Sequence, residues 1–159
     1  MEALTENKPC ITEIIDNIQC SMAKMPQVDC PLCHIFTPGM YIREIFMPAG
    51  TVVVSKIHKT EHPYIVSMGK VAVYNSEDDT VGVIEAPYTG ITKPGTRRVL
   101  QIIESTIWTT FHKTDLVKGG ENELSEEDKI KLAGEIEDVI IEKHEPQLTT
   151  RKEGILSVL

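Results

Sequence analysis

Hydrophobic and polar residues alternate with strand-like periodicity through the middle of the chain, from Phe36 to His112. Short runs rich in β-branched and aromatic residues, which favour pleated strands, are separated there by clusters of turn-forming residues. The clusters are Pro38-Gly39, Pro48-Ala49-Gly50, Asn75-Ser76-Glu77-Asp78-Asp79, Tyr88-Thr89-Gly90 and Lys93-Pro94-Gly95. Many short strands at this spacing are typical of a small antiparallel β-barrel or jelly roll. The pattern predicts a mainly β fold over residues 36–113.

The segment from Pro48 to Gly69 shows the strand pattern in most detail. Val52, Val53 and Val54 follow a glycine-containing corner, so they predict a strand that begins there. Tyr64–Ser67 predicts a second strand, which Met68-Gly69-Lys70 closes as a turn. Val71–Tyr74 then begins a third strand.

A helix is predicted before the barrel, over residues Ile11 to Met25. Its apolar residues recur at helical spacing and form one stripe, which we expect to pack on the barrel or on a partner. The stripe consists of Ile11, Ile14, Ile15, Ile18 and Met22. Pro26 ends the helix, because proline cannot donate the backbone hydrogen bond that a helix interior needs.

A second helix is predicted after the barrel, beyond a flexible polar linker at Lys118–Asn122. Ser125 is suited to cap its first turn, with Asp128 completing a near capping box, and Pro146 ends it. The expected buried face is Ile130, Leu132, Ala133, Ile136, Val139 and Ile140. The apolar residues Ile155–Leu159 at the end of the chain are expected to dock onto the body or onto a neighbouring subunit.

The length of 159 residues and mass of 17.8 kDa suit one domain. We expect a lead-in with the first helix and the cysteines over residues 1–35. The barrel follows over 36–113, and the linker, second helix and tail over 114–159.

A formal net charge of −8 argues against double-stranded DNA as a partner, because DNA affinity comes largely from lysine and arginine. No apolar run approaches the ~20 residues of a membrane helix, and the amino terminus lacks the pattern of a signal peptide. We therefore expect a soluble, cytoplasmic protein with no membrane partner. A small anion remains a candidate ligand, since Arg43, Lys56, Arg97 and Arg98 all fall within the predicted barrel.

Four cysteines lie in the first 33 residues, at positions 10, 20, 30 and 33. The string Cys30-Pro31-Leu32-Cys33-His34 has the spacing of a haem-attachment sequence and also supplies half of a zinc site. Haem attachment requires export, and zinc requires a further pair of ligands. Ordinary reduced thiols, a zinc or redox site, and haem attachment are the three alternatives.

Two histidines, His58 and His62, lie where two predicted strands meet, and imidazole is the commonest metal-binding side chain. If His58 points inward, alternation places Lys56, Val54 and Val52 on its face. A metal site, a metal-free polar pocket and an exposed loop are all compatible with this position.

The last predicted strand has two faces, and either is compatible with the interior. Thr106, Trp108, Thr110 and His112 form one face. If it points inward, Trp108 can stack on a ligand and His112 can serve as a third metal ligand or a general base. If the other face is inside, Ile107 and Phe111 fill the core. Glu44 and Glu104 are the candidate acids.

The segment from Pro48 to Gly69 resembles the first motif of the cupin superfamily. That motif consists of glycine, a short strand, His-any-His, glutamate and, after six further residues, glycine. Counting back from Gly69 places His62 at the glutamate position, His58 at the second histidine and Lys56 at the first. The second cupin motif is similar to Thr92–Arg98, with Arg98 at its histidine position. The segments 38–44, 58–62 and 104–112 resemble the small single-domain cupins encoded by tailed bacteriophages.

The resemblance implies a small jelly roll that often self-associates, and two functions follow from it. One is a metal-dependent enzyme acting on a small molecule, with His58, His62 and His112 holding Zn, Mn, Fe or Ni as a Lewis acid. The other is a non-catalytic module that binds a small anion or nucleotide, or a structural phage component, acting in the host cytoplasm. Candidate ligand-binding residues for either function are Arg43, Glu44, Lys56, Arg98, Glu104 and Trp108.

Overall fold

The computed structural model describes residues 11–75, 80–142 and 147–152. Its elements, in chain order, are α1 (Ile11–Met22), β1 (Leu32–Thr37), β2 (Met40–Met47), β3 (Thr51–Val54), β4 (His62–Asn75), β5 (Thr80–Glu85), β6 (Tyr88–Thr92), β7 (Arg98–Lys113), the 3-10 helix η1 (Glu121–Glu123), α2 (Glu126–Ile140) and β8 (Leu148–Arg151).

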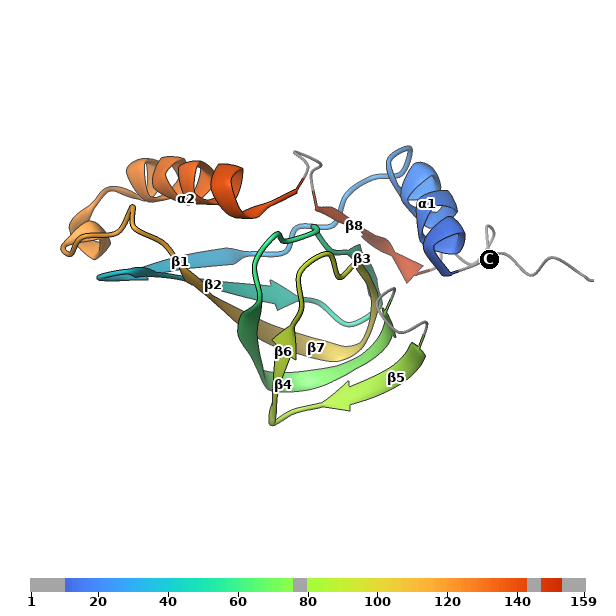
Figure 1. The fold of residues 1–159 in the computed structure, drawn as a ribbon. Coiled ribbons are helices and arrows are strands. Elements are labelled where there is room, and N and C mark those ends of the chain that lie inside the picture. The colour runs from blue at the N-terminus through green and yellow to red at the C-terminus, as the bar shows by residue number, and fades with distance from the viewer. Residues whose placement is uncertain (1–10, 76–79, 143–146, 153–159) are drawn as a thin grey trace, which may run out of the picture.

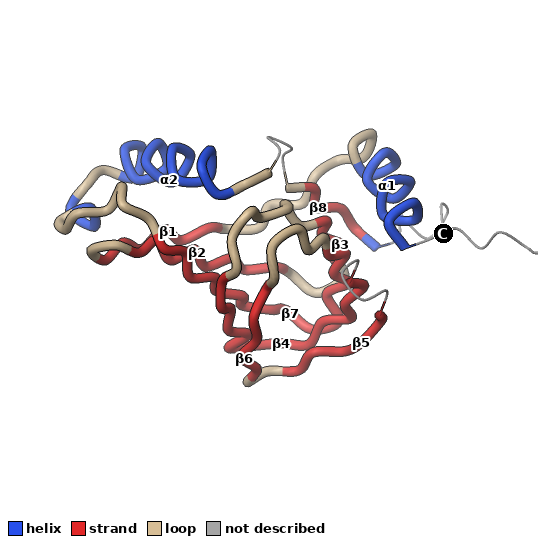
Figure 2. Tube along the Cα trace, in the orientation of Figure 1, coloured by secondary structure: helices blue, strands red, loops and turns tan. Residues whose placement is uncertain are grey.

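The long strand β7 organises a single curled sheet (Figures 1 and 2). It pairs with β2, β3 and β4, while β1 extends the sheet beyond β2 and β8 extends it beyond β3. Strands β5 and β6 both pair with β4, and every one of these pairings is antiparallel. The predicted mainly β, antiparallel, barrel-like fold with a helix on each side is confirmed.

The concave side of the sheet holds the main apolar core. Alternation along β4 buries Tyr64 and Val66 and leaves Ile65, between them, exposed. The Tyr64 ring stacks on Trp108 at a centroid distance of 4.5 Å and an interplanar angle of 11°. The whole cluster is Ile45, Met47, Val53, Tyr64, Val66, Val71, Val73, Leu100, Ile102 and Trp108. The face of β7 that carries Trp108 therefore points inward.

Helix α1 covers the outer face of β3, β7 and β8 (Figure 1). Its buried residues Ile15, Ile18 and Met22 pack there against a cluster that includes Val52 and Val54. The expectation that these two valines share the face of His58 was wrong. Strand β3 ends at Val54, so strict alternation does not continue into the following loop.

Helix α2 lies over β1 and β2 and packs on a third apolar cluster (Figure 1). The predicted cap is present, because the Ser125 hydroxyl accepts a hydrogen bond from the Asp128 amide at 3.2 Å. Ala133, Ile136 and Ile140 are buried, as expected. Of the remaining expected face, Leu132 is only partly buried, whereas Ile130 and Val139 are 60% and 65% exposed. Likewise Ile14 of α1, at 39% exposure, lies outside the buried stripe.

Gly69 does not close a strand, contrary to the sequence prediction. Strand β4 runs without interruption from His62 to Asn75, and its register against β7 shifts between Val66 and Val71. Gly69 has a φ of 100°, and a Cβ there would collide with Thr106 and with the Ser105 carbonyl. The predicted turn is thus a β-bulge, which bends one long strand and curls the sheet.

The segment after α2 returns to the sheet as β8, which the sequence analysis treated as part of a mixed tail. Leu148–Arg151 pairs antiparallel with β3. Pro146 and the apolar residues 155–159 lie outside the described residues. Within the described residues, neither helix is long and apolar enough to cross a bilayer.

Candidate metal centre and adjoining cavity

Three histidine rings meet where β4 begins and β7 ends. His62 is the first residue of β4, and the pairing of Tyr64 with Thr110 continues to place His62 opposite His112. His58 joins them from the loop between β3 and β4. The ring centroids are separated by 4.4 Å for His62 and His112, 4.6 Å for His58 and His62, and 5.1 Å for His58 and His112.

The loop that carries His58 is held from two sides. Its backbone forms an isolated bridge with Ile141, just after α2, and the His58 carbonyl accepts a hydrogen bond of 2.9 Å from the Gly95 amide. The neighbouring Lys59 amide donates to the Ile140 carbonyl at 2.7 Å. The end of α2 and the β6–β7 turn therefore fix the position of a histidine that no regular strand carries.

Hydrogen bonds orient two of the rings. His62 Nδ1 lies 3.1 Å from the Thr60 carbonyl, which can only accept, so Nδ1 carries the proton and Nε2 has a free lone pair. His112 Nε2 lies 2.8 Å from Thr110 Oγ1, and that hydroxyl lies 3.5 Å from the Arg43 carbonyl. If Thr110 donates onward to that carbonyl, His112 Nε2 donates to Thr110. The lone pair of His112 is then on Nδ1, which is buried and has no hydrogen-bond partner among the described residues.

Burial keeps these imidazoles neutral. It lowers the pKa of His58 to about 3 and that of His112 to about 2, and neighbouring histidines add to both shifts. Burial also lowers the pKa of His62, although the Thr60 hydrogen bond opposes that change. Metal ligation requires unprotonated imidazole, so the three rings are in the correct protonation state at neutral pH.

The donor set fits a divalent transition metal. One nitrogen of each ring lies within 4.8 Å of the others, and no other such group of histidine, cysteine or carboxylate residues was found in the described residues. Three nitrogens around one zinc ion at 2.0–2.1 Å lie about 3.3 Å apart. Any pair of nitrogens that lies farther apart than this would have to move closer together when an ion binds. Cys30, Cys33 and His34 do not form a comparable group.

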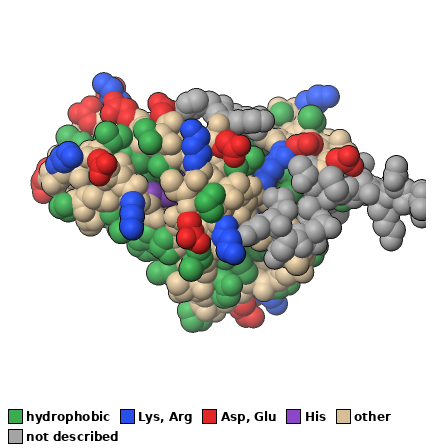
Figure 3. Space-filling view, in the orientation of Figure 1, with side chains coloured by type: hydrophobic (Ala, Val, Ile, Leu, Met, Phe, Trp, Pro, Cys, Tyr) green, Lys and Arg blue, Asp and Glu red, His purple; other side chains and the backbone are tan. Residues whose placement is uncertain are grey.

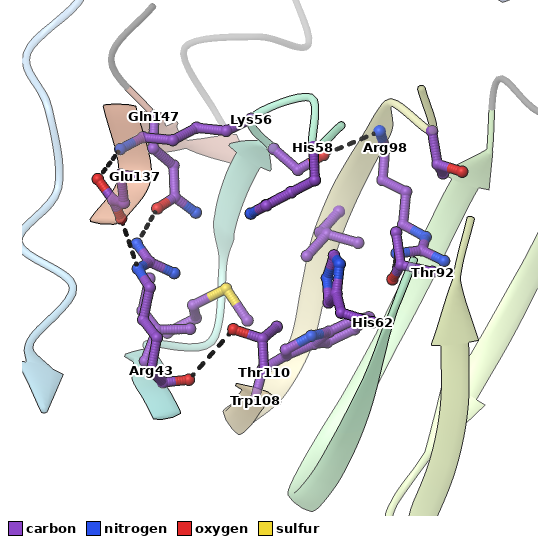
Figure 4. Close-up of a pocket in the computed structure, with 15 residues that line it drawn as sticks. Arg43, Lys56, His58, His62, Thr92, Arg98, Trp108, Thr110, Glu137 and Gln147 are labelled. Atoms are coloured by element: carbon purple, nitrogen blue, oxygen red, sulfur yellow. Dashed lines mark hydrogen bonds and ion pairs between the residues drawn. The ribbon is translucent and has the colours of Figure 1, made fainter. Parts of the chain in front are cut away.

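A cavity of about 70 Å³ opens beside His58 and His62 (Figure 4). Its wall is formed by Arg43, Ile45, Met47, Ser55, Lys56, His58, His62, Thr92, Thr96, Arg98, Leu100, Trp108, Thr110, Glu137 and Gln147. His112 is not part of this wall, since it lies behind it with only 2% of its surface exposed. Little histidine surface is visible from outside on the face drawn in Figure 3.

Arg98 forms part of one side of the cavity. Its guanidinium lies 5.1 Å from the Tyr64 ring centroid and 6.0 Å from the Trp108 ring, and it donates to Thr92 Oγ1 at 2.7 Å. The adjacent Arg97 turns the opposite way and contacts Asp16 and Gln19 of α1. The expected alternation of one arginine inward and one outward is therefore present.

A second polar group forms the opposite side, at the contact between the sheet and α2 (Figure 4). Glu137 lies between two cations, with Oε1 3.6 Å from Arg43 Nε and Oε2 3.0 Å from Lys56 Nζ. Arg43 Nη2 also donates to Gln147 Oε1 at 2.7 Å. Arg43 Nε itself is buried and has no hydrogen-bond partner among the described residues, because 3.6 Å is too long for one.

The structure brings together most of the residues proposed from sequence. Arg43, Lys56, Arg98 and Trp108 line the cavity beside the histidines. Glu44 and Glu104 do not reach it. Glu44 follows Arg43 on β2 and so lies on the opposite face of that strand, while Glu104 of β7 is exposed and pairs with Lys70 of β4.

Sequence reasoning missed Glu137, Gln147, Thr92 and Thr96. Glu137 lies on a helix rich in surface acids, and Gln147 precedes an unpredicted strand, so neither is distinguished by local spacing. Their positions depend on the docking of α2 and β8 onto the sheet. Thr92 and Thr96 lie within the segment that resembles the second cupin motif, but that resemblance assigns a role to neither.

Neither a family model nor a curated protein matches the chain. Its fold is similar to solved structures described as cupin or double-stranded β-helix domains. The Schizosaccharomyces pombe Cnp3 cupin domain is 18% identical over 59% of this chain and 67% of its own, with a TM-score of 0.47. A Klebsiella pneumoniae double-stranded β-helix protein is 15% identical over 55% and 79%, with a TM-score of 0.46. A Shewanella frigidimarina protein containing a cupin-2 domain is 9% identical over 67% and 100%, with a TM-score of 0.43. Similarities at this level identify neither a family nor a reaction for the chain.

Proposed function

We propose that this chain is a small-molecule-binding protein that holds one divalent metal ion at His58, His62 and His112. The observation that carries the proposal is the convergence of three imidazoles from three separate segments. His62 and His112 are buried and His58 is half-buried, and Nδ1 of His112 lacks any hydrogen-bond partner among the described residues. A structural histidine in a core normally has both ring nitrogens satisfied. A metal ion would use the lone pair on that orphaned nitrogen.

The metal would act as a Lewis acid toward a molecule in the adjoining cavity. The residues of the chain would bind and orient that molecule. Trp108 and Tyr64 provide an apolar wall, and Arg98 places a positive charge over both rings. The Thr60 carbonyl and the Thr110 hydroxyl hold the histidine rings in the tautomers that ligation needs.

Imidazole donors favour zinc, iron or nickel. The sequence-based set also included manganese, which prefers carboxylate oxygen, and the three-residue group contains no carboxylate. Zinc, iron and nickel are therefore the metals we propose to test first.

The alternative function is a metal-free module that binds a small anion. It is supported by the cavity wall, where the described residues include the cationic side chains of Arg43, Lys56 and Arg98 and one carboxylate, that of Glu137. Cations near a metal repel it and attract anions. We also propose a phage origin, a cytoplasmic location and a homo-oligomeric state, which are compatible with both functions.

Metal content of the purified full chain tests the proposal. Protein prepared without chelators should carry roughly one divalent ion per chain by elemental analysis, and His58→Ala, His62→Ala and His112→Ala should each lose it. His34→Ala and the double variant Cys30→Ser/Cys33→Ser are the controls and should retain the ion. Wild-type protein that neither carries nor takes up a metal would overturn the proposal and leave the anion-binding module.

A further inference from the structure

The side of the cavity opposite Arg98 already contains a carboxylate. Glu137 uses both of its oxygens there, one toward Arg43 from β2 and one toward Lys56 from the loop after β3. The side chains are only 14%, 22% and 20% exposed for Arg43, Lys56 and Glu137, respectively. Two cations, one from a strand and one from a loop, thus form a partly desolvated seat for one carboxylate group.

Glu137 does not satisfy this seat fully. Its contact with Arg43 Nε is 3.6 Å long, and that buried nitrogen has no hydrogen-bond partner among the described residues. Nη2 of Arg43 donates a hydrogen bond to Gln147 Oε1 at 2.7 Å. A carboxylate that approached Arg43 more closely would gain a charge-assisted hydrogen bond that Glu137 leaves unmade.

The charge of the cavity wall also favours an anionic ligand. Arg43, Lys56 and Arg98 contribute three positive charges and Glu137 one negative charge, in a chain whose overall formal charge is −8. A divalent ion at the histidines would add further positive charge nearby. Positive charge at this wall would favour an anionic ligand.

We propose that the cavity binds a small organic carboxylate, and that Glu137 occupies the seat of its carboxylate group until the ligand displaces it. The Glu137 side chain is 20% exposed, so rotation toward solvent would free the seat between Arg43 and Lys56. The cavity volume of about 70 Å³ is large enough for a small ligand such as acetate. This inference rests on the proposed function, because the ligand shares its cavity with the proposed metal site.

The proposal predicts that removing Glu137 strengthens carboxylate binding. Acetate is the probe, acetamide is its uncharged counterpart, and dissociation constants are measured by NMR titration of the metal-loaded full chain. Glu137→Ala should bind acetate about tenfold more tightly than wild type does. The affinity for acetamide should be the same in Glu137→Ala and in wild type. Glu135→Ala, an exposed acid on the same helix, is the matched control and should behave as wild type.

Arg43→Met and Lys56→Met should each weaken acetate binding about tenfold, since they keep the apolar stem and remove the charge. Lys59→Met, at an exposed lysine of the same loop, should leave it unchanged. If Glu137→Ala does not fold, Glu137→Gln keeps the shape, removes the competing charge and should show the same direction of change. Inorganic phosphate in parallel titrations distinguishes a carboxylate seat from a general anion site, because tighter binding of phosphate than of acetate would overturn the assignment.

The outcomes separate this inference from the metal proposal. A chain that binds no metal but whose acetate affinity rises in Glu137→Ala would retain the carboxylate seat and lose the metal function. A fully metal-loaded chain in which Glu137→Ala and Glu135→Ala bind acetate equally would retain the metal function and overturn the carboxylate seat. Equal binding of acetate and acetamide would overturn it as well.

Discussion

The Thr110 hydroxyl determines which ring nitrogen of His112 has a lone pair for a metal ion. It lies 2.8 Å from His112 Nε2 and 3.5 Å from the Arg43 carbonyl, so it can relay a hydrogen bond from the ring to the backbone. Interactions of this kind fix the tautomer and orientation of metal-ligating histidines. A single hydroxyl thus connects β2, β7 and the proposed metal site.

Thr110→Val should weaken metal binding without unfolding the chain. Loss of the hydroxyl frees the His112 ring and leaves Nε2 without its acceptor, so the dissociation constant of Zn²⁺ should rise about tenfold. Competition with a chromophoric chelator measures it. Thr109→Val, on the opposite face of β7, is the control. Equal zinc affinities for the two variants would show that Thr110 does not position His112.

At the scale of elements, the bulge at Gly69 allows β4 to serve two neighbours. Its first part pairs with β6 and its second part with β5, while the whole strand follows β7 through the register shifts. His62, at the start of β4, lies toward the end of β7 because these two strands pair antiparallel. The bulge lies beyond that part of the pairing and contributes to the curl of the sheet.

Gly69→Ala should destabilise the protein by about 2–4 kcal/mol, because a Cβ would meet Thr106 and because φ is 100°. Gly82→Ala, in the edge strand β5, is the matched control. A Cβ at Gly82 has no neighbour within 4 Å, so its effect should stay below about 1 kcal/mol. Urea unfolding of the metal-free proteins measures both, and equal stabilities would contradict the bulge geometry.

The strand pattern predicted the barrel and correctly placed β3, because alternation and turn residues are local signals. The near capping box of Ser125 and Asp128, also a local signal, correctly predicted the helix cap. The strand pattern divided β4 at Gly69, since glycine in a bulge and glycine in a turn have the same local signature. His58 and His62 were identified from their position between two predicted strands, and His112 from its place on the Trp108 face of the last one. Which face of β7 points inward, and the contribution of Glu137, depend on long-range packing that no local pattern records.

At the scale of the whole molecule, burial of uncharged histidines makes stability depend on pH. Since the pKa values of His58 and His112 are lowered in the folded chain from an ordinary 6.5, the unfolded chain binds more protons below that pH. The contribution of these two neutral histidines to the free energy of unfolding is complete above pH 6.5. It is lost progressively as the pH falls toward about 3.

The metal-free protein should therefore lose up to about 1.4 kcal/mol of unfolding free energy per pH unit, for each such histidine, below pH 6.5. Chemical unfolding between pH 7 and 5 tests this. The double variant His58→Gln/His112→Gln should show a markedly shallower dependence than His34→Gln, which is the control for a histidine outside the group. Parallel pH curves for the two variants would show that the buried group is not the origin of the dependence.

The whole-molecule arrangement also bears on self-association. The apolar stripe of α1 was expected to offer a contact surface, but Ile15, Ile18 and Met22 are buried against the chain's own sheet. The other expected surface, the apolar residues 155–159, lies outside the described residues. Self-association stays a prediction, for which light scattering at micromolar concentration is the test.

X-ray absorption spectroscopy of the full chain loaded with one equivalent of Zn²⁺ tests the central claim most directly, because it identifies the atoms bound to the ion. The predicted spectrum has nitrogen or oxygen neighbours at about 2.0–2.1 Å, outer-shell scattering from about three imidazole rings, and no sulfur neighbour. A sulfur shell at about 2.3 Å would assign the ion to cysteine ligands. That result, or a shell without imidazole scattering, would contradict a metal centre at His58, His62 and His112.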